Sequence, residues 1–223
     1  MSILNAILEI VFPSKCSSCG ENGIELCLKC LKDCPQAERE SASWIFPLFD
    51  YRHPPIKKAI VLMKYKNKKN IANLFGDILY DRMLEELSEL STMENFKEAI
   101  LIPIPLSKRR LRERGYNQAE LICNKLIKID EERNPKEEER NFKLKNNILI
   151  KIKDEEHQAR INSRRERLKN IINSFAVKNP ETIKNKNIIL IDDVTTTGAT
   201  LEEAKKTLKK AGVRKIIAFT IAH

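Results

Sequence analysis

The sequence predicts an α/β fold, in which helices cover both faces of a parallel sheet, preceded by a small cysteine-rich module. The last part of the chain, residues 188–221, alternates between strand and helix: an apolar strand, a loop, a helix and a second apolar strand. These strands are apolar throughout, which is typical of strands buried on both faces of a parallel sheet. We therefore divide the chain into a front segment, residues 1–42, and an α/β domain, residues 43–223.

The front segment opens with an apolar stretch at residues 3–11, whose spacing predicts a short helix that ends at Pro13. This stretch lacks the basic start and the cleavage site of a signal peptide. No apolar run approaches the roughly 20 residues that span a bilayer. We therefore expect a cytoplasmic protein, with a peripheral position at the inner face of the membrane as the alternative.

Four cysteines follow in two pairs, Cys16-x-x-Cys19 and Cys27-x-x-Cys30. Each pair can bring two thiolates to one ion, so the two pairs predict a four-sulfur site for a structural Zn²⁺. Disulfides are the alternative, which the absence of a secretion signal disfavours. Cys34 is left over, and the sequence predicts no role for it.

The elements of the α/β domain are predicted from apolar spacing and from turn residues. In order they are a strand at 43–51, a helix from Pro54 or Pro55, a helix through Leu90, a strand at 98–106, a basic turn at 107–115, a helix at about 117–129, a charged insertion or linker at about 130–146, a strand at 147–153 and the strand at 188–194. Thr200 and Glu203 form a capping-box pattern that predicts the start of the last helix, and Gly212 predicts its end.

Two adjacent acids and a threonine-rich loop follow the apolar run in "IILIDDVTTTGAT". Asp192 and Asp193 end the strand, where open parallel sheets bind ligands. Backbone N–H groups, hydroxyls and the positive end of the helix predict a phosphate site in this loop. The loop residues are Thr195, Thr196, Thr197, Gly198, Ala199 and Thr200. The acids would then accept hydrogen bonds from ribose hydroxyls, so the predicted ligand is a ribose 5-phosphate.

This stretch resembles the phosphoribosyl pyrophosphate (PRPP) motif of type I phosphoribosyltransferases. Together with "LIPIPLSKRRLRERGYNQAEL", "HQARINSRRERLKN" and the cysteine pairs, it resembles the ComF family, which includes ComFC proteins of bacterial DNA uptake. The resemblance runs over residues 12–223 except the charged insertion, and implies a type I phosphoribosyltransferase-like sheet.

The same resemblance implies roles for individual residues. Asp192 and Asp193 would hold the ribose O2′ and O3′, while Lys108 and Arg109 would face the diphosphate. Mg²⁺ would bind together with PRPP. The segment at residues 157–170 corresponds to the flexible loop of the family.

The chain is basic, with a formal net charge of +10. One PRPP can use only a few of these cations, so the surplus could contact the phosphates of single-stranded DNA. Direct DNA binding stays open, because few aromatic residues lie among the clusters. The clusters are Lys57, Lys58, Lys64, Lys66, Lys68 and Lys69; Arg109, Arg110, Arg112 and Arg114; and Arg160, Arg164, Arg165, Arg167 and Lys169.

Three functions are compatible with these observations. The first, implied by the resemblance, is a PRPP-binding protein of natural competence that handles imported single-stranded DNA beside a helicase-like motor. The second is a conventional phosphoribosyltransferase of nucleotide or cofactor metabolism, although the sequence names no acceptor. The third is a zinc-bearing scaffold without a ligand, which the intact acids and loop disfavour.

Overall fold

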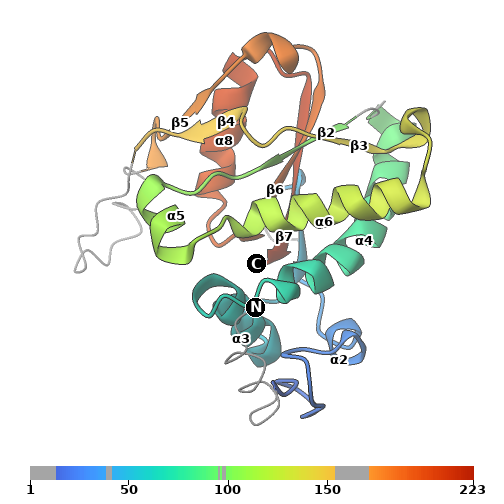
Figure 1. Ribbon diagram of the computed structural model, residues 1–223. Helices are drawn as coiled ribbons and strands as arrows, with labels where there is room; N and C mark the ends of the chain where they lie inside the picture. The colour runs from blue at the N-terminus through green and yellow to red at the C-terminus, as the bar shows by residue number, and fades with distance from the viewer. Residues whose placement is uncertain (1–13, 39–41, 95, 97–98, 154–170) are drawn as a thin grey trace.

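A computed structural model describes residues 14–38, 42–94, 96, 99–153 and 171–223 (Figure 1). The helix expected at 3–11 and the basic segment at 157–170 lie outside these residues. The elements are α2 (Leu28–Lys32), β1 (Ile45–Phe49), α3 (Pro54–Tyr65), α4 (Asn70–Glu94), β2 (Ala99–Pro103), α5 (Lys108–Arg114), α6 (Gln118–Arg133), η1 (Glu137–Glu139), β3 (Phe142–Leu144), β4 (Leu149–Lys151), β5 (Phe175–Val177), η2 (Pro180–Thr182), β6 (Asn187–Val194), α8 (Ala199–Lys210) and β7 (Lys215–Ala222). Among the helices described, none is long and apolar enough to cross a membrane.

Five parallel strands form the central sheet in the order β1-β7-β6-β2-β3. The register pairs Leu101 of β2 with Ile189 of β6, and Ile189 with Ile217 of β7. Because the strands run in one direction, their carboxyl ends meet at one edge of the sheet. Asp192 and Asp193 therefore lie at this edge, between the ends of β2 and β7, and the predicted parallel sheet is confirmed.

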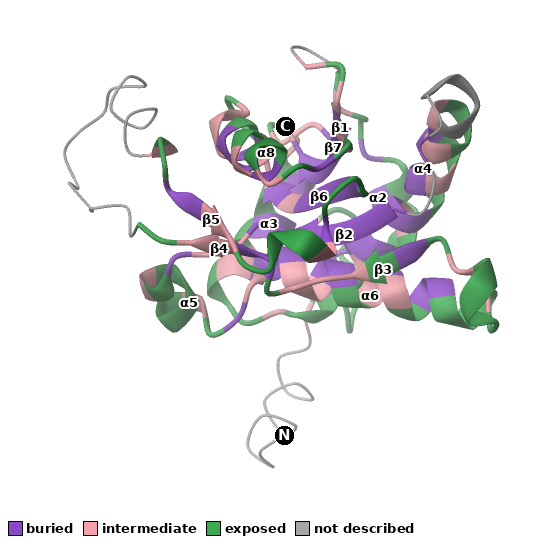
Figure 2. Cartoon of the chain, turned by 90° about the horizontal axis from the view of Figure 1, so that it is seen from above, coloured by how far each residue is buried: buried purple, intermediate pink, exposed green. Residues whose placement is uncertain are grey.

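The apolar side chains of the strands alternate between the two faces of the sheet. Ile189 and Ile191 of β6 pack in one core with residues of α4 and α6. Ile188 and Leu190 pack in a second core with residues of α8. Figure 2 shows buried residues concentrated on the strands and exposed residues on the outer sides of the helices. Because helices cover both faces of the sheet, the strands are apolar throughout.

The front segment packs on the α/β domain and shares its core (Figure 1). Leu26 and Leu31 are fully buried in the same apolar cluster as residues of α3 and α4. Lys68, between these two helices, lies with its Nζ 2.7 Å from the Glu25 carboxylate. One core therefore runs through both parts of the chain, and the division at residue 42 stays a prediction.

The basic stretch expected as a turn at 107–115 is a short helix, α5. Its first turn is capped by Ser107, whose hydroxyl accepts a hydrogen bond from the N–H of Arg110. Gly115 ends it in the left-handed conformation, at φ +77°. None of its residues is buried, so apolar spacing, the signal used for the other helices, could not reveal it.

Residues 130–146 are part of the fold and not the expected linker. They contain the end of α6, the 3-10 turn η1 and the edge strand β3, which pairs with β2. Asp130 is fully buried, and its carboxylate accepts the hydroxyl of Tyr80 at 2.8 Å and the N–H of Phe142 at 3.0 Å. Because the segment is highly charged, the sequence did not predict the short strand β3. One buried acid, whose hydrogen bonds are satisfied, stabilises this strand.

Candidate sugar-phosphate site and metal centre

The two predicted acids lie at the carboxyl end of β6. Consecutive residues of a strand point to opposite faces, so one acid faces α3 and the other faces the α8 side. The Asp193 side chain faces α3 and is buried, with 7% of the residue exposed, whereas Asp192 is half-buried. The Asp192 carboxylate accepts the backbone N–H of Asp193 at 2.8 Å, which fixes its orientation.

Burial raises the pKa of Asp192 to about 7, and the negative charge of Asp193 adds to the rise. The positive charges of Lys64 and Lys151 oppose it. Carboxylate oxygens accept hydrogen bonds, so two neighbouring acids suit a ligand whose hydroxyl groups donate them.

Two cations hold Asp193, and the sequence did not single out either for this role. Lys64 Nζ lies 2.8 Å from Oδ1, and the two side chains are 17% and 10% exposed. Arg114 Nη1 lies 3.9 Å from Oδ2 and donates to the Gln118 side chain at 2.8 Å. Both cations belong to predicted basic clusters, but only the placement of α3 and α5 in the folded chain brings them to this acid.

The threonine-rich loop joins β6 to α8. Thr195 is buried and its N–H donates to the carbonyl of Ala222, so this residue continues the sheet. Thr196 and Thr197 are exposed. Gly198 has φ +72°, which side chains other than glycine rarely adopt. The loop therefore turns on Gly198 and leads straight into the N-terminal end of α8, where backbone N–H groups favour an anion.

Helix α8 does not use the predicted capping box. It begins at Ala199, with Gly198 as its N-cap. Glu203, expected to pair with Thr200, is buried and accepts the N–H of Asn173 at 2.8 Å. The Glu203 carboxylate therefore links the segment before β5 to α8 and makes no cap at the helix end.

The two cations predicted to face a diphosphate lie at the start of α5. Helix α5 follows β2, whose Pro103 pairs with Ile191 directly before the acids. Lys108 is exposed, whereas the Arg109 guanidinium lies 2.8 Å from Glu113. Their contact with a diphosphate stays a prediction.

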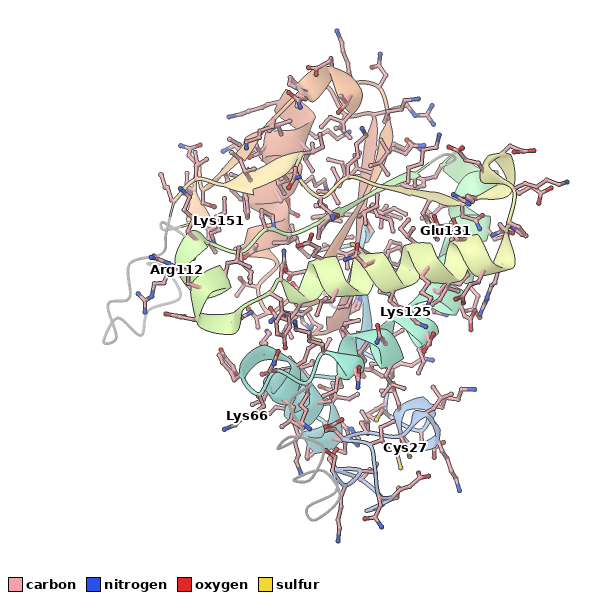
Figure 3. The ribbon with its side chains drawn as sticks, viewed as in Figure 1. Cys27, Lys66, Arg112, Lys125, Glu131 and Lys151 are labelled. Carbon is pink, nitrogen blue, oxygen red and sulfur yellow. The ribbon has the colours of Figure 1, made fainter. Side chains whose placement is uncertain are left out.

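The four predicted cysteines come together in the front segment. The Sγ atoms of Cys16, Cys19, Cys27 and Cys30 all lie within 4.8 Å of one another, and Figure 3 shows Cys27 among the sulfur atoms of this cluster. Cys19 and Cys27 are 3.7 Å apart, close to the ~3.8 Å between two sulfurs on one tetrahedral ion with bonds of about 2.3 Å. All six cysteines are free, so the disulfide alternative is not realised.

The thiols of this cluster differ in acidity. Burial raises the pKa of Cys16, but hydrogen bonds from backbone N–H groups, including that of Cys27 at 3.4 Å, lower it by more. The resulting pKa is about 6, below the ordinary value of a thiol. The N–H of Cys30 lowers the pKa of Cys27, yet burial and the neighbouring thiols raise it to about 12. Thiolates packed this closely repel one another, so the cluster is suited to a metal cation.

Comparison with known proteins agrees with this description. Residues 140–223 match the family model described as "Phosphoribosyl transferase domain". Competence protein F of Haemophilus influenzae is 30% identical over 213 residues, which cover 92% of this chain and 84% of that protein. Competence protein ComFC of Bacillus subtilis is 30% identical over 169 residues, covering 74% of this chain and 59% of that protein. DNA utilization protein YhgH of Escherichia coli O6:H1 is 25% identical over 190 residues, covering 85% and 74%.

The parallel sheet and the matched domain define the class: an α/β protein with a phosphoribosyltransferase-like domain and a four-cysteine cluster in front of it. The chain belongs to the ComF/ComFC family of competence and DNA utilization proteins.

Proposed function

We propose that this protein binds PRPP as its magnesium complex and handles imported single-stranded DNA during competence, in the cytoplasm. One observation carries the PRPP part: two acids at the end of β6 are followed by a loop that turns on Gly198 into the N-terminus of α8. This arrangement offers acceptors for sugar hydroxyls next to donors for a phosphate.

In this proposal, each group of the ligand meets a different part of the chain. Asp192 and Asp193 accept hydrogen bonds from the ribose hydroxyls. Thr196 to Thr200 hold the 5-phosphate, and Lys108 and Arg109 approach the diphosphate. Mg²⁺ enters with PRPP, since a diphosphate carries it as part of the substrate.

A conventional phosphoribosyltransferase is the second candidate, favoured by the match to a phosphoribosyl transferase domain. In such a reaction PRPP loses pyrophosphate from C1 through an oxocarbenium-like state, while the side chains orient the ligand and stabilise charge. Release of pyrophosphate with a nitrogenous acceptor would support this candidate. Loss of transformation without loss of growth, after deletion of the gene, would support the competence role.

We assign the four-cysteine cluster to a structural Zn²⁺. Four cysteine ligands leave no open position for a substrate, so the ion would stabilise the front segment and take no part in a reaction. The module packs into the core beside α3 and α4, so its folding supports the rest of the molecule.

DNA contact is proposed for the surface at the end of α3. Two lysines of the first basic cluster, Lys64 and Lys68, are paired with acids, but Lys57, Lys58, Lys66 and Lys69 are exposed. Tyr65 directly precedes Lys66 at the end of α3 and has 66% of its surface exposed, and the Arg114 guanidinium lies 5.4 Å from its ring. An exposed aromatic ring among cations suits a stacked base beside a phosphate backbone.

Calorimetry with PRPP and Mg²⁺ tests the first part of the proposal. We expect the wild type to bind and the Asp192→Ala/Asp193→Ala variant to lose most of its affinity. Glu138→Gln, an exposed acid in η1, is the control. Equal binding by wild type and double variant would remove the proposed ribose contacts.

A labelled oligonucleotide in a salt series tests the second part. Electrostatic contact requires affinity to fall steeply as salt rises. Tyr65→Ala should weaken binding by about 1–3 kcal/mol if a base stacks on this ring. Absence of binding by the wild type at low salt would end the claim of direct DNA contact.

A further inference from the structure

We propose that Lys64 is a positioning residue of the sugar-phosphate site: its ammonium group holds the Asp193 carboxylate in place and neutralises it for an anionic ligand. This inference rests on the proposed function, because it concerns the same pair of acids. It adds a residue from α3, far from the motif in the chain.

The geometry of the pair is that of a fixed contact. Lys64 Nζ is 2.8 Å from Asp193 Oδ1, and both side chains are more than four-fifths buried. Arg114 approaches the other oxygen, Oδ2, at 3.9 Å and is itself 9% exposed. The carboxylate is therefore held from two sides, by cations that come from different helices.

The end of α3 is well anchored, so Lys64 cannot move away easily. Its neighbour Met63 is fully buried, and the Met63 carbonyl accepts a hydrogen bond from the Tyr116 hydroxyl. Tyr116 directly follows Gly115, the residue that ends α5. The same contact thus fixes the helix that carries Lys64 to the segment that follows Arg114.

Charge explains why the site needs such a residue. PRPP carries several negative charges, and two carboxylates beside it would repel it. An unpaired unit charge about 4 Å away weakens binding by about fivefold in bulk water and by about a thousandfold at the effective dielectric near a protein surface. With Lys64 and Arg114 beside Asp193, and Lys151 opposing the charge of Asp192, the acids can accept hydroxyl hydrogen bonds without this penalty.

A double-mutant cycle with PRPP and Mg²⁺ tests the inference by calorimetry. Lys64→Met should weaken binding by about tenfold or more at pH 7, and Lys64→Arg should restore most of it. Lys128→Met is the matched control, since Lys128 is a lysine of α6 that also pairs with an acid, Glu132, and has a side chain that is 70% exposed, so this variant should bind like the wild type. In the Asp193→Asn background, Lys64→Met should change affinity by no more than about twofold.

The pH dependence of PRPP binding gives a second test, because a purely structural role of Lys64 would leave it unchanged. Lys64 lowers the pKa of Asp192, and among the described residues Asp193 and Lys151 also act on this carboxyl by their charge. The pH at which binding changes should therefore be higher in Lys64→Met than in the wild type. Lys64→Met leaves a buried carboxylate unpaired, and this variant could fail to fold for that reason. In that case two other variants still test the coupling: Lys64→Met/Asp193→Asn, which removes both charges, and Lys64→Arg, which keeps them.

The outcomes separate this inference from the proposed function. A wild type that does not bind PRPP overturns both. A wild type that binds PRPP, together with a Lys64→Met variant that binds as well as Lys128→Met, overturns only the role of Lys64. An equal loss from Lys64→Met with and without Asp193→Asn also overturns it, because Lys64 would then act independently of the acid.

Discussion

Replacing Asp192 by Asn should stabilise the free protein at alkaline pH. Folding raises the pKa of this carboxyl from an ordinary 3.8 to about 7, chiefly by burial and then by the charge of Asp193. The folded state therefore binds the proton more tightly than the unfolded chain does. This favourable contribution is complete below about pH 4 and is lost as the pH rises towards 7 and beyond.

The expected size follows from this difference. A change from 3.8 to about 7 corresponds to about 4 kcal/mol between the two protonation states. Asp192 is only half-buried, and water screens part of the effect, so we take about half of this value. Asp192→Asn should raise the free energy of unfolding by about 2 kcal/mol at pH 8.5 and change it little at pH 4.5.

Urea unfolding at several pH values measures this effect in protein prepared with Zn²⁺ and without sugar phosphate. Trp44, the single tryptophan, is a convenient fluorescence probe, because its indole N–H donates to Glu202 of α8. Glu138→Gln, at an exposed acid, is the control and should follow the wild type. If Asp192→Asn is no more stable than the wild type at pH 8.5, or keeps the same pH dependence, the argument from burial is refuted.

Two further predictions concern the loop and the metal centre. Gly198→Ala places a side chain at φ +72°, so we expect a loss of about 1–2 kcal/mol in stability and weaker PRPP binding; thermal unfolding and calorimetry would check this, and an unchanged variant would contradict the strained turn. Removal of Zn²⁺ by a chelator, or Cys27→Ser, should lower the unfolding temperature of the whole molecule, because Leu26 and Leu31 share its core. Cys123→Ser, outside the cluster, controls for loss of a buried thiol, and unfolding of the front segment alone would contradict a shared core.

The features that could be predicted from the sequence are those that depend on short, contiguous stretches of residues. Apolar strands, the acids at the end of β6 and the paired cysteines depend on residues that are close in the chain. The structure confirms the parallel sheet and the cysteine cluster. Helix α5 was missed because no residue of it is buried, although Ser107 and Gly115 carry ordinary helix-end signals.

Predictions failed where a polar side chain found its partner far away in the chain. Glu203 was expected to cap α8, but it accepts the N–H of Asn173. Asp130 was assigned to a solvated insertion or linker, but it is buried against Tyr80 and the start of β3. A charged residue shows its type in the sequence but not the group that satisfies it, and that group decides whether burial is tolerated.

The sequence by itself determined which chemical groups this protein offers: paired acids, a threonine-rich loop at the start of a helix and four thiols at metal-binding spacing. These features are local, because the residues that act together are neighbours in the chain. Only the tertiary structure decided that Lys64 and Arg114 meet Asp193, and that the front module shares the core of the sheet. Such contacts depend on where α3, α5 and the front segment lie relative to the strands, and short-range spacing carries no information about that arrangement.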